Sequence, residues 1–170
     1  MKKIILIGFA ACYKSHVGKL LADKLNCAFV DTDREIECRC GMTVRQIFET
    51  MGEGYFRAME NALLLTLNDN NTVVACGGGS VMSHNFDNFA YGGTVVCLTA
   101  TAETVHSRLG DGSRPLFDGI TVEQLNSFMQ QRALLYAKYA NATFDTDGKT
   151  SQQVADQVYE WLITGSNINR

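Results

Sequence analysis

The stretch KIILIGFAACYKS, residues 3–15, predicts a buried strand, a sharp turn and the start of a helix. Residues 4–7 form a short apolar run that suits a parallel strand covered on both faces, and residues 16–25 carry apolar side chains at helical spacing. Gly8, followed six residues later by Lys14 and Ser15, is typical of a phosphate-binding turn. In such a turn the backbone N–H groups and the positive end of the helix dipole hold phosphate oxygens, the lysine adds a charge, and the serine hydroxyl can bind magnesium.

Two positions of this turn depart from the nucleotide-binding pattern. The pattern Gly-x-x-x-x-Gly-Lys-Ser/Thr requires a glycine where Tyr13 stands, and many small kinases have another where Ala11 stands. Glycines allow unusual φ/ψ angles and let the backbone touch the phosphates. The sequence therefore predicts either that the Tyr13 ring crowds the nucleotide or that the backbone carries a strain of about 1 to 3 kcal/mol.

Composition indicates one globular domain with a substantial core, because 46% of the 170 residues are hydrophobic. The 15 basic and 18 acidic residues give a net charge of -3, which argues against a nucleic-acid or membrane surface as the main partner. Neither a signal peptide nor an apolar run of membrane-spanning length is evident, so we expect a cytoplasmic protein. The six cysteines are then expected to be reduced. We also expect a monomer, since no long exposed apolar face is evident.

Short apolar runs alternate with helical patterns along the chain. Strands are predicted at 3–7, 27–30, 72–76, 94–98 and, more weakly, 142–144; helices are predicted at 33–39, 43–68 with an interruption near 52–54, 82–89, 101–109, 121–140 and 151–163. This alternation predicts an α/β fold, a parallel sheet with right-handed crossovers and helices on both faces. Such sheets bind ligands at the carboxyl ends of their strands, where the candidate functional residues of this chain also fall.

Asp31 and Asp33 follow the second predicted strand and have two interpretations. In an extended segment, carboxylates at i and i+2 point to the same side, so both would face one cleft. One carboxylate would then hold a nucleotide's magnesium ion through water, while the other accepts a proton from a substrate hydroxyl. Alternatively, one of them caps a helix, because aspartate is favoured at that position.

Further candidates lie at Arg57 and at three consecutive glycines, residues 77–79. A guanidinium suits a substrate carboxylate, although a helix-surface ion pair with Glu53 or Glu60 is the simpler explanation of Arg57. Three glycines after a strand indicate close approach of the backbone to a ligand, or positive φ.

Three more arginines are candidates, with an ordinary solvated arginine as the alternative for each. Arg114 lies in a glycine-rich loop that could close over a nucleotide and bring its charge to the transferring phosphoryl group. Arg108 could stack on a nucleotide base, and Arg132 could contact the substrate.

The order of these motifs resembles the shikimate kinase family over residues 3–163. The shared motifs are the phosphate loop, the sequence Asp31-Thr32-Asp33, the sequence Gly52-Glu53 with Phe56-Arg57, the triple glycine, Arg114-Pro115-Leu116, and Arg132 ahead of Leu135-Tyr136. The resemblance implies a P-loop fold like that of nucleoside-monophosphate kinases: three layers with a five-stranded parallel sheet, in a single kinase domain spanning 1–170. It also implies a substrate-binding region at about 33–60 and a lid at about 109–120. The implied reaction transfers the γ-phosphoryl group of ATP to the 3-hydroxyl of shikimate, in the route to chorismate and the aromatic amino acids.

Matched position by position, the resemblance also implies residue roles. Lys14 contacts the ATP phosphates, Ser15 and Asp31 hold Mg²⁺, and Asp33 binds and deprotonates the attacking hydroxyl. Lys14, Asp33 and Arg114 are the implied catalytic residues. The implied ATP site further contains Ala11, Cys12, Tyr13, His16, Arg108 and Arg114, and the implied shikimate site contains Asp33, Arg57, Gly77, Gly78, Gly79 and Arg132.

The departures leave three hypotheses open. Leu134 replaces the usual proline of Arg-x-Pro-Leu-Tyr, which is expected to affect only helix geometry. The altered phosphate loop matters more. The chain is an active shikimate kinase, or a shikimate-binding homologue with weak or no ATP turnover because of Ala11 and Tyr13, or a kinase for another hydroxylated acid.

Overall fold

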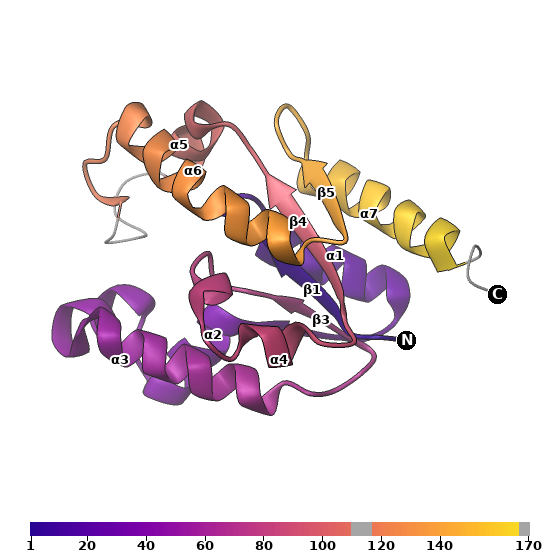
Figure 1. Ribbon diagram of the computed structural model, residues 1–170, viewed down its shortest axis with the longest axis horizontal. Coiled ribbons are helices and arrows are strands. Elements are labelled where there is room, and N and C mark those ends of the chain that lie inside the picture. The colour runs from indigo at the N-terminus through magenta and orange to yellow at the C-terminus, as the bar shows by residue number, and fades with distance from the viewer. Residues whose placement is uncertain (110–116, 167–170) are drawn as a thin grey trace.

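The computed structural model describes residues 1–109 and 117–166 of the chain, and its centre is a five-stranded parallel sheet (Figure 1). The strands lie in the order β2-β3-β1-β4-β5. Their bounds are Ile4–Ile7 (β1), Ala28–Asp31 (β2), Thr72–Ala75 (β3), Thr94–Thr99 (β4) and Ala142–Asp145 (β5). The predicted parallel sheet is confirmed, and β1, which leads into the phosphate loop, is its central strand.

The central strands are buried on both faces, as their continuous apolar sequences predict. Every residue of β1 and β3 is buried. Ile4 pairs with Val73 on one side and with Thr94 on the other. This register brings the ends of β1, β3 and β2 to the same edge of the sheet, where the phosphate loop, the triple glycine and the two aspartates follow.

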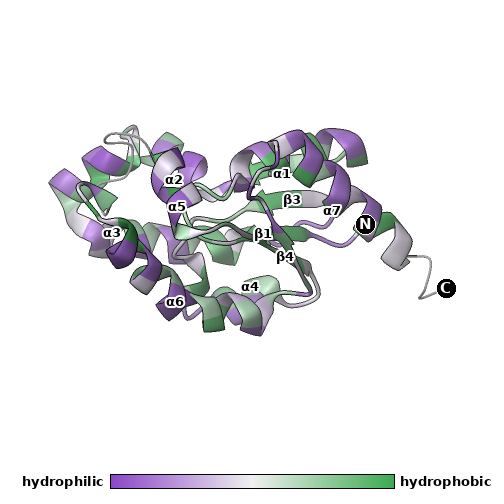
Figure 2. Cartoon of the chain, turned by 90° about the horizontal axis from the view of Figure 1, so that it is seen from above, coloured by the Kyte–Doolittle hydropathy of each residue, from purple (hydrophilic) through white to green (hydrophobic). Residues whose placement is uncertain are grey.

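Helices cover both faces of the sheet, giving three layers (Figure 2). The helices α1 and α7 lie against each other on one face, while α4 and α6 lie on the other. The bounds are Lys14–Leu25 (α1), Thr32–Cys40 (α2), Val44–Thr66 (α3), Phe86–Ala90 (α4), Ala102–Leu109 (α5), Val122–Tyr139 (α6) and Ser151–Ser166 (α7), with a short 3₁₀ helix η1 at Ser80–Met82. Among the described residues, no helix is both long and apolar enough to span a membrane.

The helices α2 and α3 pack together around a small core of their own. Thr43 opens α3 with a capping box, because its hydroxyl accepts from the Gln46 backbone N–H while the Gln46 side chain accepts from the Thr43 N–H. The helix is interrupted at Gly52, where φ is 82°, as predicted from the glycines at 52 and 54. Phe48 lies before the kink and Arg57 after it, and both line the same cavity.

Two local predictions were wrong. The helix expected at 82–89 is two shorter elements, η1 and α4, because residues 83–85 leave helical geometry at the Ser83 turn. Asp31 and Asp33 do not share an extended segment, because β2 ends at Asp31 and α2 begins at Thr32. Both carboxylates nevertheless line the same cavity, although by a strand-to-helix turn and not by strand alternation.

Candidate active site

The phosphate loop between β1 and α1 keeps a glycine-like backbone despite its sequence. Ala11 has φ 58°, and Tyr13, which precedes the first turn of α1, has φ 64° and ψ 11°. For residues with a β-carbon this left-handed conformation costs roughly 1–2 kcal/mol each. The predicted backbone strain is therefore present. It lies at Tyr13, where the pattern requires glycine, and at Ala11, where many small kinases have one.

The Tyr13 ring lies against the guanidinium of Arg108, at the end of α5. The Arg108 Cζ atom is 3.8 Å from the ring centroid. Arg108 also donates hydrogen bonds to the Ala11 carbonyl (3.3 Å) and to the hydroxyl and carbonyl oxygens of Thr146, both at 2.8 Å. A cation–π contact of this kind contributes roughly 0.5–2 kcal/mol, which is of the same size as the strain at one left-handed residue.

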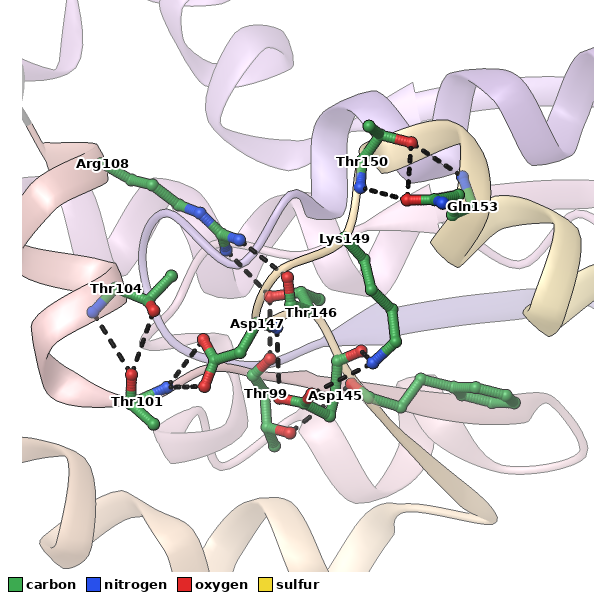
Figure 3. Close-up of polar contacts among 11 residues, drawn as sticks. Thr99, Thr101, Thr104, Arg108, Asp145, Thr146, Asp147, Lys149, Thr150 and Gln153 are labelled. Atoms are coloured by element: carbon green, nitrogen blue, oxygen red, sulfur yellow. Dashed lines mark hydrogen bonds and ion pairs between the residues drawn. The ribbon is translucent and has the colours of Figure 1, made fainter.

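Arg108 is held in place by the loop that follows β5 (Figure 3). In this loop Thr146 is fully buried, and its hydroxyl donates to the Thr99 carbonyl at the end of β4 (2.9 Å). Both carboxylate oxygens of Asp147 accept from the backbone N–H of Thr101, at 3.0 and 3.2 Å. Both ends of α5 are thus tied to residues 146–147.

A cavity of about 200 Å³ opens in front of the phosphate loop, at the place predicted for the nucleotide. Lys14 is buried there, and its ammonium donates to the Phe9 carbonyl at 2.6 Å, within the loop. The cavity contains the predicted ATP-site residues that the structure describes: Ala11, Cys12, Tyr13, Lys14, Ser15, His16 and Arg108. Arg114, the remaining residue predicted for this site, lies outside the described residues.

Asp31 combines the two interpretations offered by the sequence. One of its carboxylate oxygens caps α2, accepting from the N–H groups of Asp33 (3.1 Å) and Arg34 (3.2 Å). The same residue lines the phosphate-loop cavity together with Ser15. Capping therefore fixes the orientation of a carboxylate that lies at this cavity.

A second, narrower cavity lies beside the first and contains the predicted substrate residues. Its polar lining consists of Asp33, Arg57, Gly77, Gly78, Gly79 and Arg132, and its apolar lining of Ala10, Val44, Phe48, Phe56 and Phe117. Asp33, Gly77 and Gly78 line both cavities. The two cavities therefore meet at one carboxylate and at the backbone that follows β3.

Arg57 is oriented by two glutamates. Its guanidinium pairs with Glu53 at 3.0 Å and with Glu60 at 2.9 Å. Glu60 is 1% exposed and also accepts from the Ser80 hydroxyl at 2.6 Å. Burial alone would lower the pKa of Arg57, but Glu60 and Glu53 raise it overall, so the cation persists. The ion pairs of Arg57 with Glu53 and Glu60 that the sequence suggested are thus present, and they hold the Arg57 guanidinium at the cavity.

The triple glycine makes room for charged side chains. A β-carbon on Gly77 would lie 2.5 Å from an Asp33 carboxylate oxygen and 2.9 Å from a Glu60 oxygen, and one on Gly79 would lie 2.5 Å from the Arg57 guanidinium. None of the three glycines has a positive φ. The positive-φ interpretation is therefore wrong, the glycines lie close to side chains of the site, and the approach to a ligand stays a prediction.

Arg132 on α6 lines the second cavity next to a buried tyrosine. The Gly78 carbonyl accepts from the Tyr136 hydroxyl at 2.6 Å and from Arg132 at 3.5 Å. Arg132 also lies over the Phe9 ring, 5.3 Å from its centroid. Burial raises the pKa of Tyr136, so its hydroxyl stays protonated and donates to this carbonyl. Arg132 and the triple glycine are thereby fixed relative to each other.

Comparison with known proteins identifies the family. The family model described as shikimate kinase matches residues 10–163. A shikimate kinase from Persephonella marina is 38% identical over 161 residues, covering 93% of this chain and 97% of its own. The chain belongs to the shikimate kinase family. These matches confirm the predicted family and the predicted kinase activity. They also confirm the predicted function, which is ATP-dependent phosphorylation of shikimate.

Solved structures agree with this assignment. A shikimate kinase from Acinetobacter baumannii in complex with shikimate superimposes with a TM-score of 0.90 at 31% identity, covering 97% of this chain and 94% of its own. A shikimate kinase from Aquifex aeolicus gives a TM-score of 0.83 at 32% identity, covering 96% and 98%. The predicted P-loop fold like that of nucleoside-monophosphate kinases is confirmed.

Sequence reasoning missed part of the site of this shikimate kinase homologue. The apolar walls of the second cavity are Phe48, Phe56 and Phe117. Phe48 and Phe117 belong to no motif, and Phe56, which shares α3 with Phe48, was quoted in the Phe56-Arg57 motif without a role of its own. Glu60 was recognised only as an ion-pair partner of Arg57, because its burial and its bond to Ser80 are tertiary features. Tyr136 appeared in a family motif, but its contact with Gly78 spans 58 residues of sequence.

The donor set for a metal in this family member is small. Within residues 1–109 and 117–166, no group of three or more histidine, cysteine, aspartate or glutamate side chains is arranged to hold a metal ion. Ser15 and Asp31 line one cavity next to Lys14 and offer a hydroxyl and a carboxylate. Such hard oxygen donors suit Mg²⁺, which usually takes one or two protein ligands together with water and substrate phosphates.

Proposed function

We propose that this protein transfers the γ-phosphoryl group of ATP to the 3-hydroxyl of shikimate, with the nucleotide and the substrate in the two adjoining cavities. The observation that supports this proposal is the position of Asp33, which lines both cavities. A carboxylate at this junction can hold the attacking hydroxyl in line with a phosphoryl donor on the phosphate loop. Phosphoryl transfer depends mainly on such positioning and on charge stabilisation.

On the nucleotide side, Lys14 would leave the Phe9 carbonyl and bind the phosphates of ATP. Its present bond keeps the buried ammonium satisfied and close to the loop N–H groups. Ser15 and Asp31 would hold Mg²⁺, which supplies charge neutralisation to the phosphates when bound. Arg108 would flank the adenine. Arg114, assigned here from the family motif, would stabilise the transferring group.

On the substrate side, Arg57 and Arg132 would bind the carboxylate of shikimate. They lie on different helices, α3 and α6, and line one cavity with the Gly77–Gly79 backbone. Two guanidinium groups fix a carboxylate in position, while Asp33 accepts the proton of the reacting hydroxyl. Phe48, Phe56 and Phe117 would exclude water from the ring of the substrate.

The wider organisation is part of the proposal. Residues 1–170 form a single kinase domain, with about 33–60 as the substrate-binding region and about 109–120 as the lid. The protein would act as a monomer in the cytoplasm.

A coupled assay with ATP, Mg²⁺ and shikimate tests the proposal directly, and Asp33→Asn tests its central residue. We expect the variant to bind ATP normally while kcat falls about 10³-fold, because general-base catalysis typically contributes 10²- to 10⁴-fold. Asp156→Asn, which changes an exposed carboxylate paired with Lys24 at 2.8 Å, is the matched control. Retained turnover in Asp33→Asn would remove this residue from the mechanism.

The strained loop supports a second candidate function, which the same assay can test. Ala11 and Tyr13 hold left-handed conformations that glycine adopts without strain. A protein that binds shikimate by calorimetry but releases no ADP at high ATP would be the shikimate-binding homologue with weak or no ATP turnover.

A further inference from the structure

The contact between Tyr13 and Arg108 points to a role of Arg108 in nucleotide binding other than flanking the base. We propose that Arg108 is a positioning residue that holds the phosphate loop in its phosphate-binding shape, through its bond to the Ala11 carbonyl and its stacking on the Tyr13 ring. Because this chain lacks glycines at positions 11 and 13, its loop needs a restraint to keep this shape, and Arg108 would supply it. The inference rests on the proposed use of ATP, because it concerns how the same loop receives phosphate.

The geometry places both Arg108 contacts at the strained positions. The guanidinium reaches the carbonyl of one left-handed residue, Ala11, and covers the ring of the other, Tyr13. Without these contacts both residues would favour right-handed or extended backbone, since each has a β-carbon. Such a change would alter the directions of the N–H groups of the loop. A bound phosphate needs those N–H groups to converge.

Arg108 is itself anchored, as a restraint has to be. Two of its hydrogen bonds go to Thr146, which is fully buried and bonded to the end of β4. These bonds lie along the edge of the guanidinium, while the Tyr13 ring covers one of its faces. Figure 3 shows Arg108 extending from α5 toward Thr146. The phosphate loop is therefore tied through Arg108 to the sheet.

Tripolyphosphate, a ligand that has phosphates but no base, distinguishes restraint of the loop from recognition of the adenine base. If Arg108 only flanks adenine, Arg108→Ala should weaken ATP and leave tripolyphosphate unaffected. If it holds the loop, Arg108→Ala should weaken both, with roughly a tenfold loss for tripolyphosphate measured by calorimetry or by competition with ATP. That loss corresponds to about 1.4 kcal/mol, within the range of a single cation–π contact. Arg39→Ala, which changes a surface arginine paired with Glu35, is the matched control.

A variant with glycine at both loop positions gives the decisive comparison, because Arg108 could also attract phosphate by charge alone. In an Ala11→Gly/Tyr13→Gly background the loop should no longer need the restraint, so Arg108→Ala should cost less than about threefold in tripolyphosphate affinity. An equal loss in both backgrounds would overturn the proposal in favour of direct charge attraction. A loss confined to ATP would overturn it in favour of base recognition.

Stability measurements make the test independent of any ligand and of turnover. Arg108→Ala should lower the melting temperature more in the natural loop than in the glycine loop, and equal shifts would contradict the proposal. Tyr13→Phe should behave like the natural protein, whereas Tyr13→Leu should lose the coupling because it keeps the β-carbon but not the ring. If Arg108→Ala does not fold, Arg108→Lys, which keeps the charge without the planar group, goes through the same comparison. A protein without kinase activity that still shows the coupling would refute the proposed function and not this inference.

Discussion

The two cavities of the site treat glycine in opposite ways. Around the substrate, Gly77 and Gly79 have ordinary backbone angles but leave no room for a β-carbon beside Asp33 and Arg57. In the phosphate loop, Ala11 and Tyr13 occupy positions that favour glycine for its angles, and the loop keeps its shape. A glycine required for conformation alone can thus be replaced where another contact offsets the strain, whereas replacing a glycine required for space displaces the side chains beside it.

Gly8 combines both requirements, and it is the glycine of the loop that this chain retains. Its φ of 137° lies in a region that residues with a β-carbon rarely adopt. A β-carbon there would also lie 2.1 Å from the Leu98 carbonyl oxygen, which belongs to the backbone of β4 and cannot move aside. The comparison therefore predicts how strongly substitutions affect the protein. The effect should be largest at Gly8, smaller at the triple glycine and smallest at Ala11 and Tyr13.

The largest effect is expected for Gly8→Ala. Strain and the clash with β4 act together at the centre of the sheet, so we expect the free energy of unfolding to fall by about 4 kcal/mol or more. Chemical denaturation of the purified variant, or its absence from the soluble fraction, measures this. A variant with a melting temperature near that of the natural protein would show that the ranking by space and angle is wrong.

Gly77→Ala should reduce catalysis more than stability. The added methyl group would push the Asp33 carboxylate out of line, and a displacement of about 1 Å can lower kcat about 10²-fold. The KM for ATP should change little, because the phosphate loop is untouched. Gly54→Ala is the matched control: nothing lies within 4 Å of its β-carbon, and alanine should stabilise α3 by about 0.5–1 kcal/mol. Unchanged kcat in Gly77→Ala would mean that Asp33 adapts or is not the base.

Gly79→Ala should act on binding, because its β-carbon would meet the flexible end of Arg57. We expect the KM for shikimate to rise roughly tenfold, the loss of about one charged hydrogen bond, with kcat within about threefold of the natural value. Steady-state kinetics with shikimate varied at saturating ATP separates the two constants. A fall in kcat without a change in KM would contradict the assignment of Arg57 to the substrate carboxylate.

The sequence predicted the parts of this structure that depend on local pattern. The five strands, the capping box at Thr43 and the break at Gly52 follow from periodicity, side-chain capping and backbone freedom, each readable within a few residues. The order of the strands in the sheet and the burial of Glu60 depend on long-range packing and were not predicted. The helix expected at 82–89 failed because apolar spacing does not reveal a turn at Ser83.

The candidate site shows the same division. Motifs identified the charged residues, and the structure brings the described ones together in two cavities. The sequence also marked Ala11 and Tyr13 as departures, but it could not show that Arg108, 95 positions after Tyr13, would contact both. A defect recognised in one segment was thus compensated from another, and only the folded chain reveals that compensation.

Among the substitutions at the site itself, the smallest effect, and a gain, is expected for Ala11→Gly. Relief of the left-handed strain at φ 58° should exceed the entropy lost by introducing glycine, giving about 0.5–1 kcal/mol of stability and a rise in melting temperature of about 1–4 °C. Asn26→Gly is the matched control, since Asn26 has φ 50° but asparagine tolerates this conformation well. Calorimetry of both variants compares them directly. If Ala11→Gly gains no more than Asn26→Gly, the loop bears no excess strain at Ala11, and the contrast between the two cavities would rest on space alone.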